Sequence, residues 1–223
     1  MATVLVIGAS RGIGLEFVRQ YRAAGDAVIA TARDAGGLVR LRELGAQALA
    51  LDVNDEASQT AFLTQLGAPA LDLALYVVGV FPLPDARTPP QRADFDHAMH
   101  TNVLAAMQLL PRVAPLVAAA PRGRFAFLSS EMAQIEGVAD SQAWVYRASK
   151  AALNMAVASA QNDYPQAILV ALSPGWVQTD MGGAEAPLTV QQSVAGMRST
   201  LARLAPSDRG AFLNYDGQRF SGW

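Results

Sequence analysis

The chain has 223 residues, a length that favours one globular domain over two. Hydrophobic residues make up 52% of it and charged residues 16%, a balance that excludes intrinsic disorder and suits a sheet buried on both faces. The formal net charge of -2 provides no basic surface for a phosphate backbone, so we expect no nucleic-acid partner.

Cysteine is absent and histidine occurs only at His97 and His100, which excludes disulfides and thiol chemistry and argues against a zinc site. We interpret both histidines as solvated or capping residues of a helix rather than catalytic groups. No basic leader precedes the first apolar run, and the longest apolar stretch, Leu73–Phe81, is too short to cross a bilayer. The sequence therefore predicts a cytoplasmic protein with no metal and no membrane partner.

Short β-rich runs alternate with longer, Ala-rich amphipathic runs along the chain. Strands are predicted at Val4–Ile7, Ala27–Ala32, Ala46–Leu51, Leu71–Val78, Arg124–Leu128, Ala167–Leu172 and Ala211–Asn214. Helices are predicted at Gly12–Ala24, Leu38–Leu44, Glu56–Leu66, Phe95–Val117, Tyr146–Asp163 and Gln191–Leu204. Such alternation is typical of βαβ units, so we expect one α/β domain over residues 1–223. Right-handed crossovers would give it a doubly wound parallel sheet, with a binding crevice at the carboxyl ends of the strands.

The first predicted strand runs into a glycine-rich turn, and a helix follows at once. Glycines in such a turn allow positive φ and close backbone approach, so the N–H groups of the helix start can bind a pyrophosphate. The spacing is G-x-x-x-G-x-G, and a purely structural turn is the alternative. Because a strand precedes the turn and a helix follows it, we favour a dinucleotide site. The residues assigned to the cofactor here are Gly8, Ser10, Arg11, Gly12, Ile13 and Gly14.

Two arginines flank the expected position of the adenosine ribose. Arg11 lies inside the turn, and Arg33 follows the second strand, where an NAD-binding protein has an acidic residue. Ala32 supplies no such acid, so two guanidinium groups would match the 2′-phosphate of NADP(H), unless both only solvate their loops. Asp52, assigned to the cofactor with Val53, would accept a hydrogen bond from adenine or cap the next helix.

Tyr146 and Lys150 begin a predicted helix, where positions four apart share one face. A phenol with a pKa of about 10 needs about 4 kcal/mol of phenolate stabilisation to donate a proton near pH 7, and a nearby lysine cation supplies much of it. The alternative is an exposed helical pair. Because the pair follows a strand that ends in Ser129 and Ser130 at the crevice, we favour a catalytic pair.

Together these motifs resemble the short-chain dehydrogenase/reductase family over essentially the whole chain, and within it the C-factor-like and sniffer-like subgroup. The resemblance implies a Rossmann fold in which Ser130 orients the substrate, Tyr146 is the acid/base, and Lys150 binds the ribose and lowers the tyrosine pKa. It also implies that Asn102 holds a water that links Lys150 to solvent. The further residues that it assigns to the cofactor, beside Tyr146 and Lys150, are Gly79, Pro174, Gly175, Val177 and Thr179.

The chain departs from the family at the turn after the fourth strand. The family usually has Asn-Asn-Ala-Gly there, whereas this chain has Tyr76-Val77-Val78-Gly79 and loses both asparagines. The hydrogen bonds that normally tie this turn to the sheet are therefore in question, but the proton relay is not. The loop Glu131–Ala143 is a few residues longer than usual and is expected to bulge at the pocket.

The resemblance implies an NADPH-dependent carbonyl reductase or alcohol dehydrogenase for a small carbonyl or alcohol, in a homo-oligomer that is a dimer or tetramer. The alternative is a cofactor-binding regulatory or signalling protein of C-factor type with little turnover, which the altered turn mildly favours. Trp144, Trp176 and Met181 either line a bulky apolar pocket or belong to the core. The glycine-containing segment 182–187 is expected to be a mobile lid.

Overall fold

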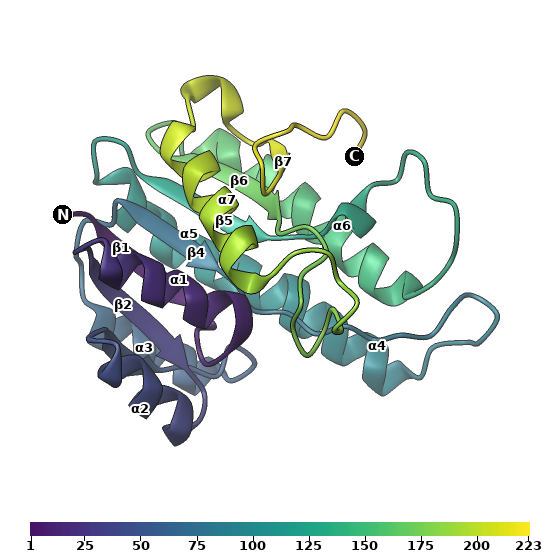
Figure 1. Cartoon of the computed structure of the whole chain (residues 1–223), viewed down its shortest axis with the longest axis horizontal. Coiled ribbons are helices and arrows are strands. Elements are labelled where there is room, and N and C mark those ends of the chain that lie inside the picture. Colours follow the sequence, from purple (N-terminus) through teal and green to yellow (C-terminus); the bar gives the residue numbers. More distant parts are fainter.

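The computed structural model describes residues 1–223 and contains one seven-stranded sheet in which every pair of neighbouring strands runs parallel (Figure 1). The strands are β1 (Thr3–Ile7), β2 (Ala27–Ala32), β3 (Gln47–Ala50), β4 (Leu73–Tyr76), β5 (Arg124–Leu128), β6 (Ile168–Ser173) and β7 (Phe212–Asn214). Their order is β3-β2-β1-β4-β5-β6-β7, so the switch point lies between β1 and β4. The doubly wound α/β fold is confirmed, although β3 and β4 are shorter than the predicted 46–51 and 71–78 because their strand pairing covers fewer residues.

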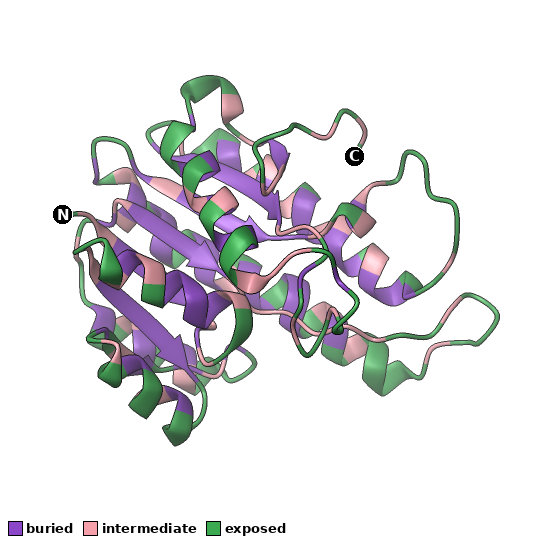
Figure 2. Ribbon diagram, viewed as in Figure 1, coloured by how far each residue is buried: buried purple, intermediate pink, exposed green.

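Helices cover both faces of the sheet, with α1, α2 and α7 on one face and α3, α5 and α6 on the other (Figures 1 and 2). Their bounds are α1 (Gly12–Ala23), α2 (Ala35–Glu43), α3 (Glu56–Leu66), α4 (Arg92–Met99), α5 (Ala105–Ala118), α6 (Trp144–Ala160) and α7 (Val190–Arg203), with short helical turns η2 (Glu131–Ala133), η3 (Gln161–Asp163) and η4 (Pro206–Asp208). No helix combines the length and the apolar character needed to cross a membrane.

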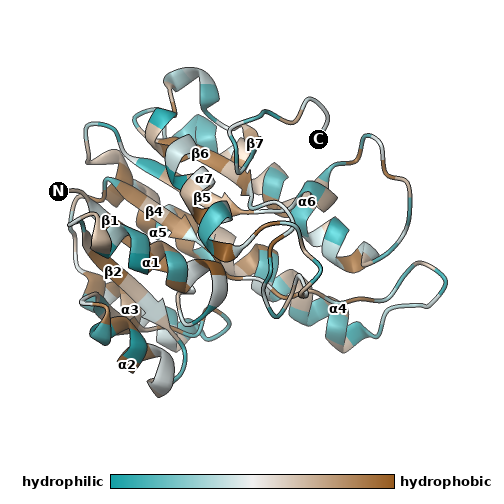
Figure 3. Cartoon of the chain, in the orientation of Figure 1, coloured by the Kyte–Doolittle hydropathy of each residue, from teal (hydrophilic) through white to brown (hydrophobic).

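Strand side chains alternate between two cores, one under each helical layer. Val4 and Val6 join the core below α1 and α7, whereas Leu5 and Ile7 join the core below α3 and α5. Because both faces are buried, the strands are predominantly apolar. Figure 3 accordingly shows brown strands at the centre and teal segments on the outer helices.

Local backbone conformation corrects two predicted helix starts. The α2 helix begins three residues before the predicted Leu38, because the Asp34 carboxylate accepts a hydrogen bond from the Gly37 N–H at 2.8 Å and caps it. The α6 helix begins at Trp144, directly after the buried Ala143, the only non-glycine residue with a positive φ, 54°. Such a left-handed residue is uncommon and is held in place by its surroundings.

The long helix predicted at Phe95–Val117 consists of three consecutive segments. α4 leads into a π-helical turn, η1 (His100–Leu104), and η1 continues into α5. A π turn inserts an additional residue into the helical repeat and so rotates the faces of the helix after it. Sequence periodicity did not reveal this turn, because the apolar positions on either side each follow an ordinary helical repeat.

The core assignment predicts a contrast between two phenylalanines. Phe62 of α3 is fully buried, and we expect Phe62→Ala to lower the free energy of unfolding by about 3–5 kcal/mol because a cavity remains. Phe95 of α4 is 41% exposed, and Phe95→Ala should change it by about 0.5 kcal/mol or less. Urea unfolding followed by circular dichroism measures both, and equal losses would contradict the assigned core.

Candidate active site

The predicted site residues lie where the carboxyl ends of four strands meet. β1 leads into the glycine-rich turn, β4 into Gly79, β5 into Ser130, and β6 into Pro174. Because all strands of a parallel sheet point the same way, segments far apart in the sequence come together at this one edge. The structure therefore brings together the four motifs that the sequence singles out.

The glycine-rich turn has a backbone that side chains would obstruct. Gly8 has a φ of 88° and Gly12 a φ of 52°. A Cβ on Gly8 would lie 2.6 Å from the Val78 side chain, and one on Gly14 would lie 2.2 Å from the Gly8 carbonyl oxygen. The α1 helix starts here without a side-chain cap, so its first N–H groups have no side-chain acceptor and point toward the crevice edge of the sheet. Such a helix start suits an anion.

The two arginines predicted to converge on the ribose have different surroundings. Arg11 forms an ion pair with Asp180 at 2.9 Å, from the glycine-rich turn to the segment after β6. A different arginine, Arg40 of α2, donates to the Ser10 carbonyl oxygen at 3.1 Å. The hydrogen bond from the Gly37 N–H lowers the pKa of Asp34, and the charges of Arg40 and Arg33 act in the same direction. Sequence reasoning missed Arg40 at this turn because its contact depends on how α2 packs. The assignment of Arg11 and Arg33 to the ribose stays a prediction.

Asp52 does not cap the helix that follows it. Its carboxylate accepts a hydrogen bond from the Asn54 N–H at 3.0 Å, while Asp55 caps α3 through the Ala57 N–H. Its own N–H donates to a serine hydroxyl in α3. The capping alternative is therefore wrong for Asp52. Val53, beside it, is buried against the core below α3.

Tyr146 is buried on the first turn of α6, with 6% of its surface exposed. The ring of Phe81, from the loop after β4, packs edge-on against it with centroids 4.6 Å apart. Burial raises the pKa of Tyr146 to about 12, and a hydrogen bond with Ser130 opposes that rise. The Ser130 oxygen accepts from the Met132 N–H, which leaves its hydroxyl proton available for the phenol. The lowering of the tyrosine pKa by Lys150 stays a prediction.

Lys150 is the only lysine of the chain, and 3% of it is exposed. Its Nζ donates to the Leu128 carbonyl oxygen at 2.7 Å and lies 5.7 Å from the centroid of the Tyr146 ring. Burial lowers the pKa of Lys150 to about 8, because a desolvated ammonium is unfavourable. The exposed-pair alternative is excluded, since both side chains are buried.

Asn102 lies in the π turn η1 and is fully buried. Its Nδ2 donates to the Val80 carbonyl oxygen and to the Ser149 hydroxyl, and its Oδ1 accepts from the Val80 N–H at 2.8 Å. Gly79 lies between this amide and Lys150, because a Cβ on Gly79 would be 3.3 Å from the lysine Nζ and 3.4 Å from the Asn102 Oδ1. Asn102 thus joins the turn after β4 to α6.

The segment after β6 is held in place by its own hydrogen bonds. Gly175 has a φ of 74°, and the Thr179 hydroxyl accepts from the Gly182 N–H at 3.0 Å. The Trp176 Nε1 donates to the Gly182 carbonyl oxygen, and Val177 forms a bridge with Leu188. The stretch expected to be a lid is therefore tied to the Pro-Gly segment at both ends. Its looseness stays a prediction.

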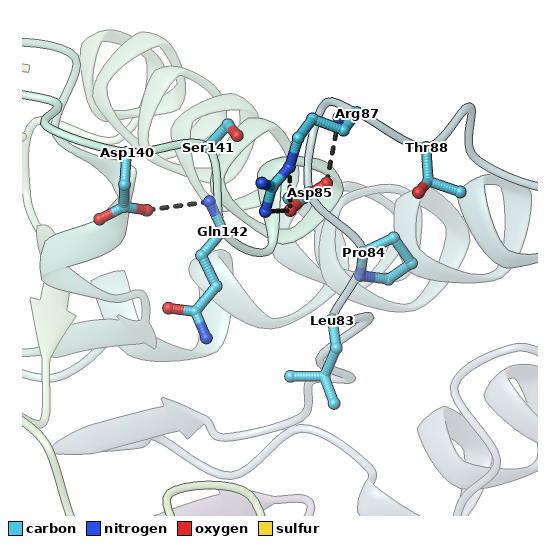
Figure 4. Close-up of a pocket in the computed structure, with 8 residues that line it drawn as sticks. All are labelled: Leu83, Pro84, Asp85, Arg87, Thr88, Asp140, Ser141 and Gln142. Atoms are coloured by element: carbon cyan, nitrogen blue, oxygen red, sulfur yellow. Dashed lines mark hydrogen bonds and ion pairs between the residues drawn. The ribbon is translucent and has the colours of Figure 1, made fainter.

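Trp144, Trp176 and Met181 are 37%, 52% and 46% exposed, so the core alternative for them is wrong. A separate cavity of about 920 Å³ opens between the loop that contains residues 83–88 and the loop that contains residues 140–142 (Figure 4). Asp85 pairs with Arg87 on one loop, and the Ala86 N–H donates to Ser141 on the other. The cavity is lined by Leu83, Pro84, Asp85, Arg87, Thr88, Asp140, Ser141 and Gln142.

A doubly wound sheet with a glycine-rich turn and a buried Tyr–Lys pair at its carboxyl edge defines a dinucleotide-binding oxidoreductase. The chain belongs to the short chain dehydrogenase family, whose family model matches residues 2–187. C-signal of Myxococcus xanthus is 36% identical over 159 residues, 70% of this chain and 96% of that protein.

Two solved structures share the whole fold. The carbonyl reductase Sniffer of D. melanogaster has a TM-score of 0.91 at 28% identity, with 100% of both chains covered. A carbonyl reductase from Pseudomonas aeruginosa PAO1 in complex with NADP has a TM-score of 0.84 at 28% identity, again with 100% of both chains covered. The resemblance to C-factor-like and sniffer-like proteins is thereby confirmed.

The burial of the single lysine leads to a titration experiment. Lysine labelled with ¹³C gives one side-chain signal, and we expect it to titrate with a pKa of about 8 in the folded protein. The urea-unfolded chain should titrate at the ordinary value of 10.5. Between about pH 8 and pH 10.5 the unfolded chain keeps the lysine proton that the folded chain has lost. The contribution of Lys150 to the free energy of unfolding therefore rises with pH over this range. A folded-state pKa of 10.5 would contradict the assigned burial.

Proposed function

We propose that the chain is an NADPH-dependent carbonyl reductase or alcohol dehydrogenase that acts on a small carbonyl or alcohol. The observation that carries the proposal is the buried pair of Tyr146 and Lys150, with the half-buried Ser130 beside the phenol, at the crevice edge of the sheet. The similarity to the Sniffer and P. aeruginosa carbonyl reductases supports the same class of reaction. Small-molecule oxidoreduction also fits the short chain dehydrogenase family.

The residues at the crevice fit a dinucleotide. Gly8 and Gly14 let the turn 8–14 pack closely against Val78 and against its own backbone, and the turn leads into a helix start with no side-chain cap, which suits a pyrophosphate. We assign the pyrophosphate to this turn and the adenine to Asp52 and Val53. When bound, NADPH supplies the hydride. The residues that we assign to its nicotinamide half are Gly79, Tyr146, Lys150, Pro174, Gly175, Val177 and Thr179.

Tyr146 is the proposed proton donor. With its pKa raised to about 12, the phenol stays protonated at neutral pH and loses its proton only when the substrate oxygen becomes strongly basic. Ser130 is placed to hydrogen-bond the same oxygen. Lys150, with its pKa near 8, is mostly charged at pH 7, and a unit charge about 6 Å from a phenolate is worth about 3 kcal/mol at an effective dielectric of about 20. The hydrogen bond to the Leu128 carbonyl oxygen holds the Nζ of this lysine near the Tyr146 ring.

The preference for NADPH over NADH rests on arginines at the end of β2. Arg33 follows Ala32, which provides no carboxylate for a free 2′-hydroxyl. Arg40 contacts the carbonyl oxygen of Ser10 from the next helix, so we assign its guanidinium to the 2′-phosphate together with Arg11 and Arg33. Asp34 does not oppose them freely, because its carboxylate caps α2.

A second candidate is a cofactor-binding signalling protein with little turnover. The observation that favours it is the 36% identity to C-signal over 159 residues. Loss of NADPH absorbance with benzaldehyde, cyclohexanone and menadione separates the two candidates. Turnover supports the enzyme, whereas tight NADPH binding with no turnover on a broad carbonyl panel supports the signalling protein.

The proton-donor assignment predicts a specific loss of activity. Tyr146→Phe keeps the ring and removes the proton, so kcat should fall roughly 10²–10⁴-fold while the Kd for NADPH changes little. Tyr164→Phe, directly after the turn η3 that follows α6, is the matched control and should keep kcat. Steady-state kinetics and fluorescence titration measure both quantities. Wild-type turnover by Tyr146→Phe would show that another group donates the proton.

The arginine assignment predicts a change in cofactor selectivity. Arg33→Ala and Arg40→Ala should each raise the Kd for NADPH roughly 10- to 100-fold, since charge-assisted hydrogen bonds to a phosphate are lost. The Kd for NADH should change little. Arg42→Ala, an exposed arginine on the same helix, is the control. Equal binding of NADPH and NADH by the unmodified protein would contradict the assignment.

A further inference from the structure

Tyr76 is the last residue of β4, a central strand of the sheet. Its backbone pairs with Ile7 of β1 and Phe127 of β5, and its side chain is fully buried. Its hydroxyl donates a hydrogen bond to the Thr101 carbonyl oxygen at 3.0 Å. The bond runs from the sheet to the π turn η1. A strand end is thus attached directly to the helical segment that carries Asn102.

Thr101 is held from a second side as well. Its hydroxyl exchanges hydrogen bonds with the Asn54 side chain, from the segment after β3. The next residue, Asn102, uses its whole amide to bind Val80 and Ser149. Because adjacent residues share a peptide plane, a displacement of the Thr101 carbonyl displaces Asn102 with it.

The family pattern at this turn cannot supply the attachment in this chain. Tyr76 and Val77 stand where the family usually has two asparagines, so neither side-chain amide is available. A phenylalanine would fill the same core volume at position 76. A buried hydroxyl, by contrast, adds the cost of desolvation and contributes only about 1 kcal/mol net when it is bonded. Core packing therefore accounts for the ring of Tyr76 but not for its hydroxyl.

We propose that Tyr76 is a positioning residue whose hydroxyl fixes the π turn and thereby orients Asn102 against Gly79 and the start of α6. The inference rests on the proposed reductase function of this site. Asn102 then holds the Gly79–Val80 backbone and the Ser149 hydroxyl, on two sides of Lys150. Tyr76 touches neither substrate nor cofactor in this assignment, and its effect passes through Asn102.

The test compares Tyr76→Phe with Tyr21→Phe, which removes the hydroxyl of another buried tyrosine, in α1. With the fastest of benzaldehyde, cyclohexanone and menadione, kcat should fall roughly 10- to 100-fold in Tyr76→Phe, as misplaced catalytic groups do. KM and the Kd for NADPH should stay within about twofold. Tyr21→Phe should leave kcat unchanged.

The ¹³C-lysine signal provides a readout that core packing alone would not move. Tyr76→Phe should raise the Lys150 pKa from about 8 toward its ordinary value, because a loosened turn admits water to the ammonium. Tyr146 is the titratable group beside it. Tyr21→Phe should leave the Lys150 titration unchanged.

A double-mutant cycle with Asn102→Ala tests whether Tyr76 affects the site through Asn102. If Tyr76 acts through Asn102, adding Tyr76→Phe to Asn102→Ala lowers kcat by no more than about twofold further. Wild-type kcat together with an unchanged lysine titration in Tyr76→Phe overturns the proposal, and so do fully additive losses. If the unmodified protein reduces no carbonyl, the proposed function fails, yet the lysine titration still decides the role of Tyr76.

Discussion

Parallel pairing of all seven strands is the constraint on which the rest of the molecule depends. Each connection must return over a face of the sheet, so helices bury both faces and strand residues such as Val4 and Leu5 alternate between two cores. The same constraint collects every carboxyl strand end at one edge. Four motifs that are spread over most of the chain therefore meet at this edge. They are the glycine-rich turn, Ser130, the Tyr146–Lys150 pair and the Pro-Gly segment.

That edge accommodates a cation in a dry environment. The Lys150 ammonium has a backbone carbonyl as its hydrogen-bond acceptor and no carboxylate partner, and its lowered pKa expresses the resulting cost. Gly79 leaves room for it, and Asn102 holds the backbone around that glycine. Burial also raises the pKa of Tyr146. The pKa values of both residues are therefore shifted in the direction that favours the neutral side chain. Electrostatic help from a bound phosphate or substrate would therefore have a large effect at this site.

The π turn connects this site to the sheet. It turns Asn102 inward between the β4 loop and α6, and the Tyr76 hydroxyl reaches the adjacent carbonyl from the strand side. Neither residue 76 nor residue 77 offers a side-chain amide at this turn, and the Tyr76 hydroxyl is the group that joins β4 to η1. The segment after β6 also has local contacts, such as the hydrogen bond from the Trp176 Nε1 to the Gly182 carbonyl oxygen.

The sequence by itself determined the fold class, the order of elements and the motifs at the crevice, because apolar periodicity and glycine spacing are local properties. Tyr146 and Lys150 share a helix face by spacing alone, so their pairing was predictable. Only the tertiary structure decided that Arg11 pairs with Asp180, that Arg40 reaches Ser10, and that Tyr76 bonds to Thr101. Those contacts join residues that are 25 to 169 positions apart in the sequence. No local sequence pattern encodes contacts over such distances. The shifted pKa values of Tyr146 and Lys150 were likewise decided by the tertiary structure, because the packing of the whole chain buries both side chains.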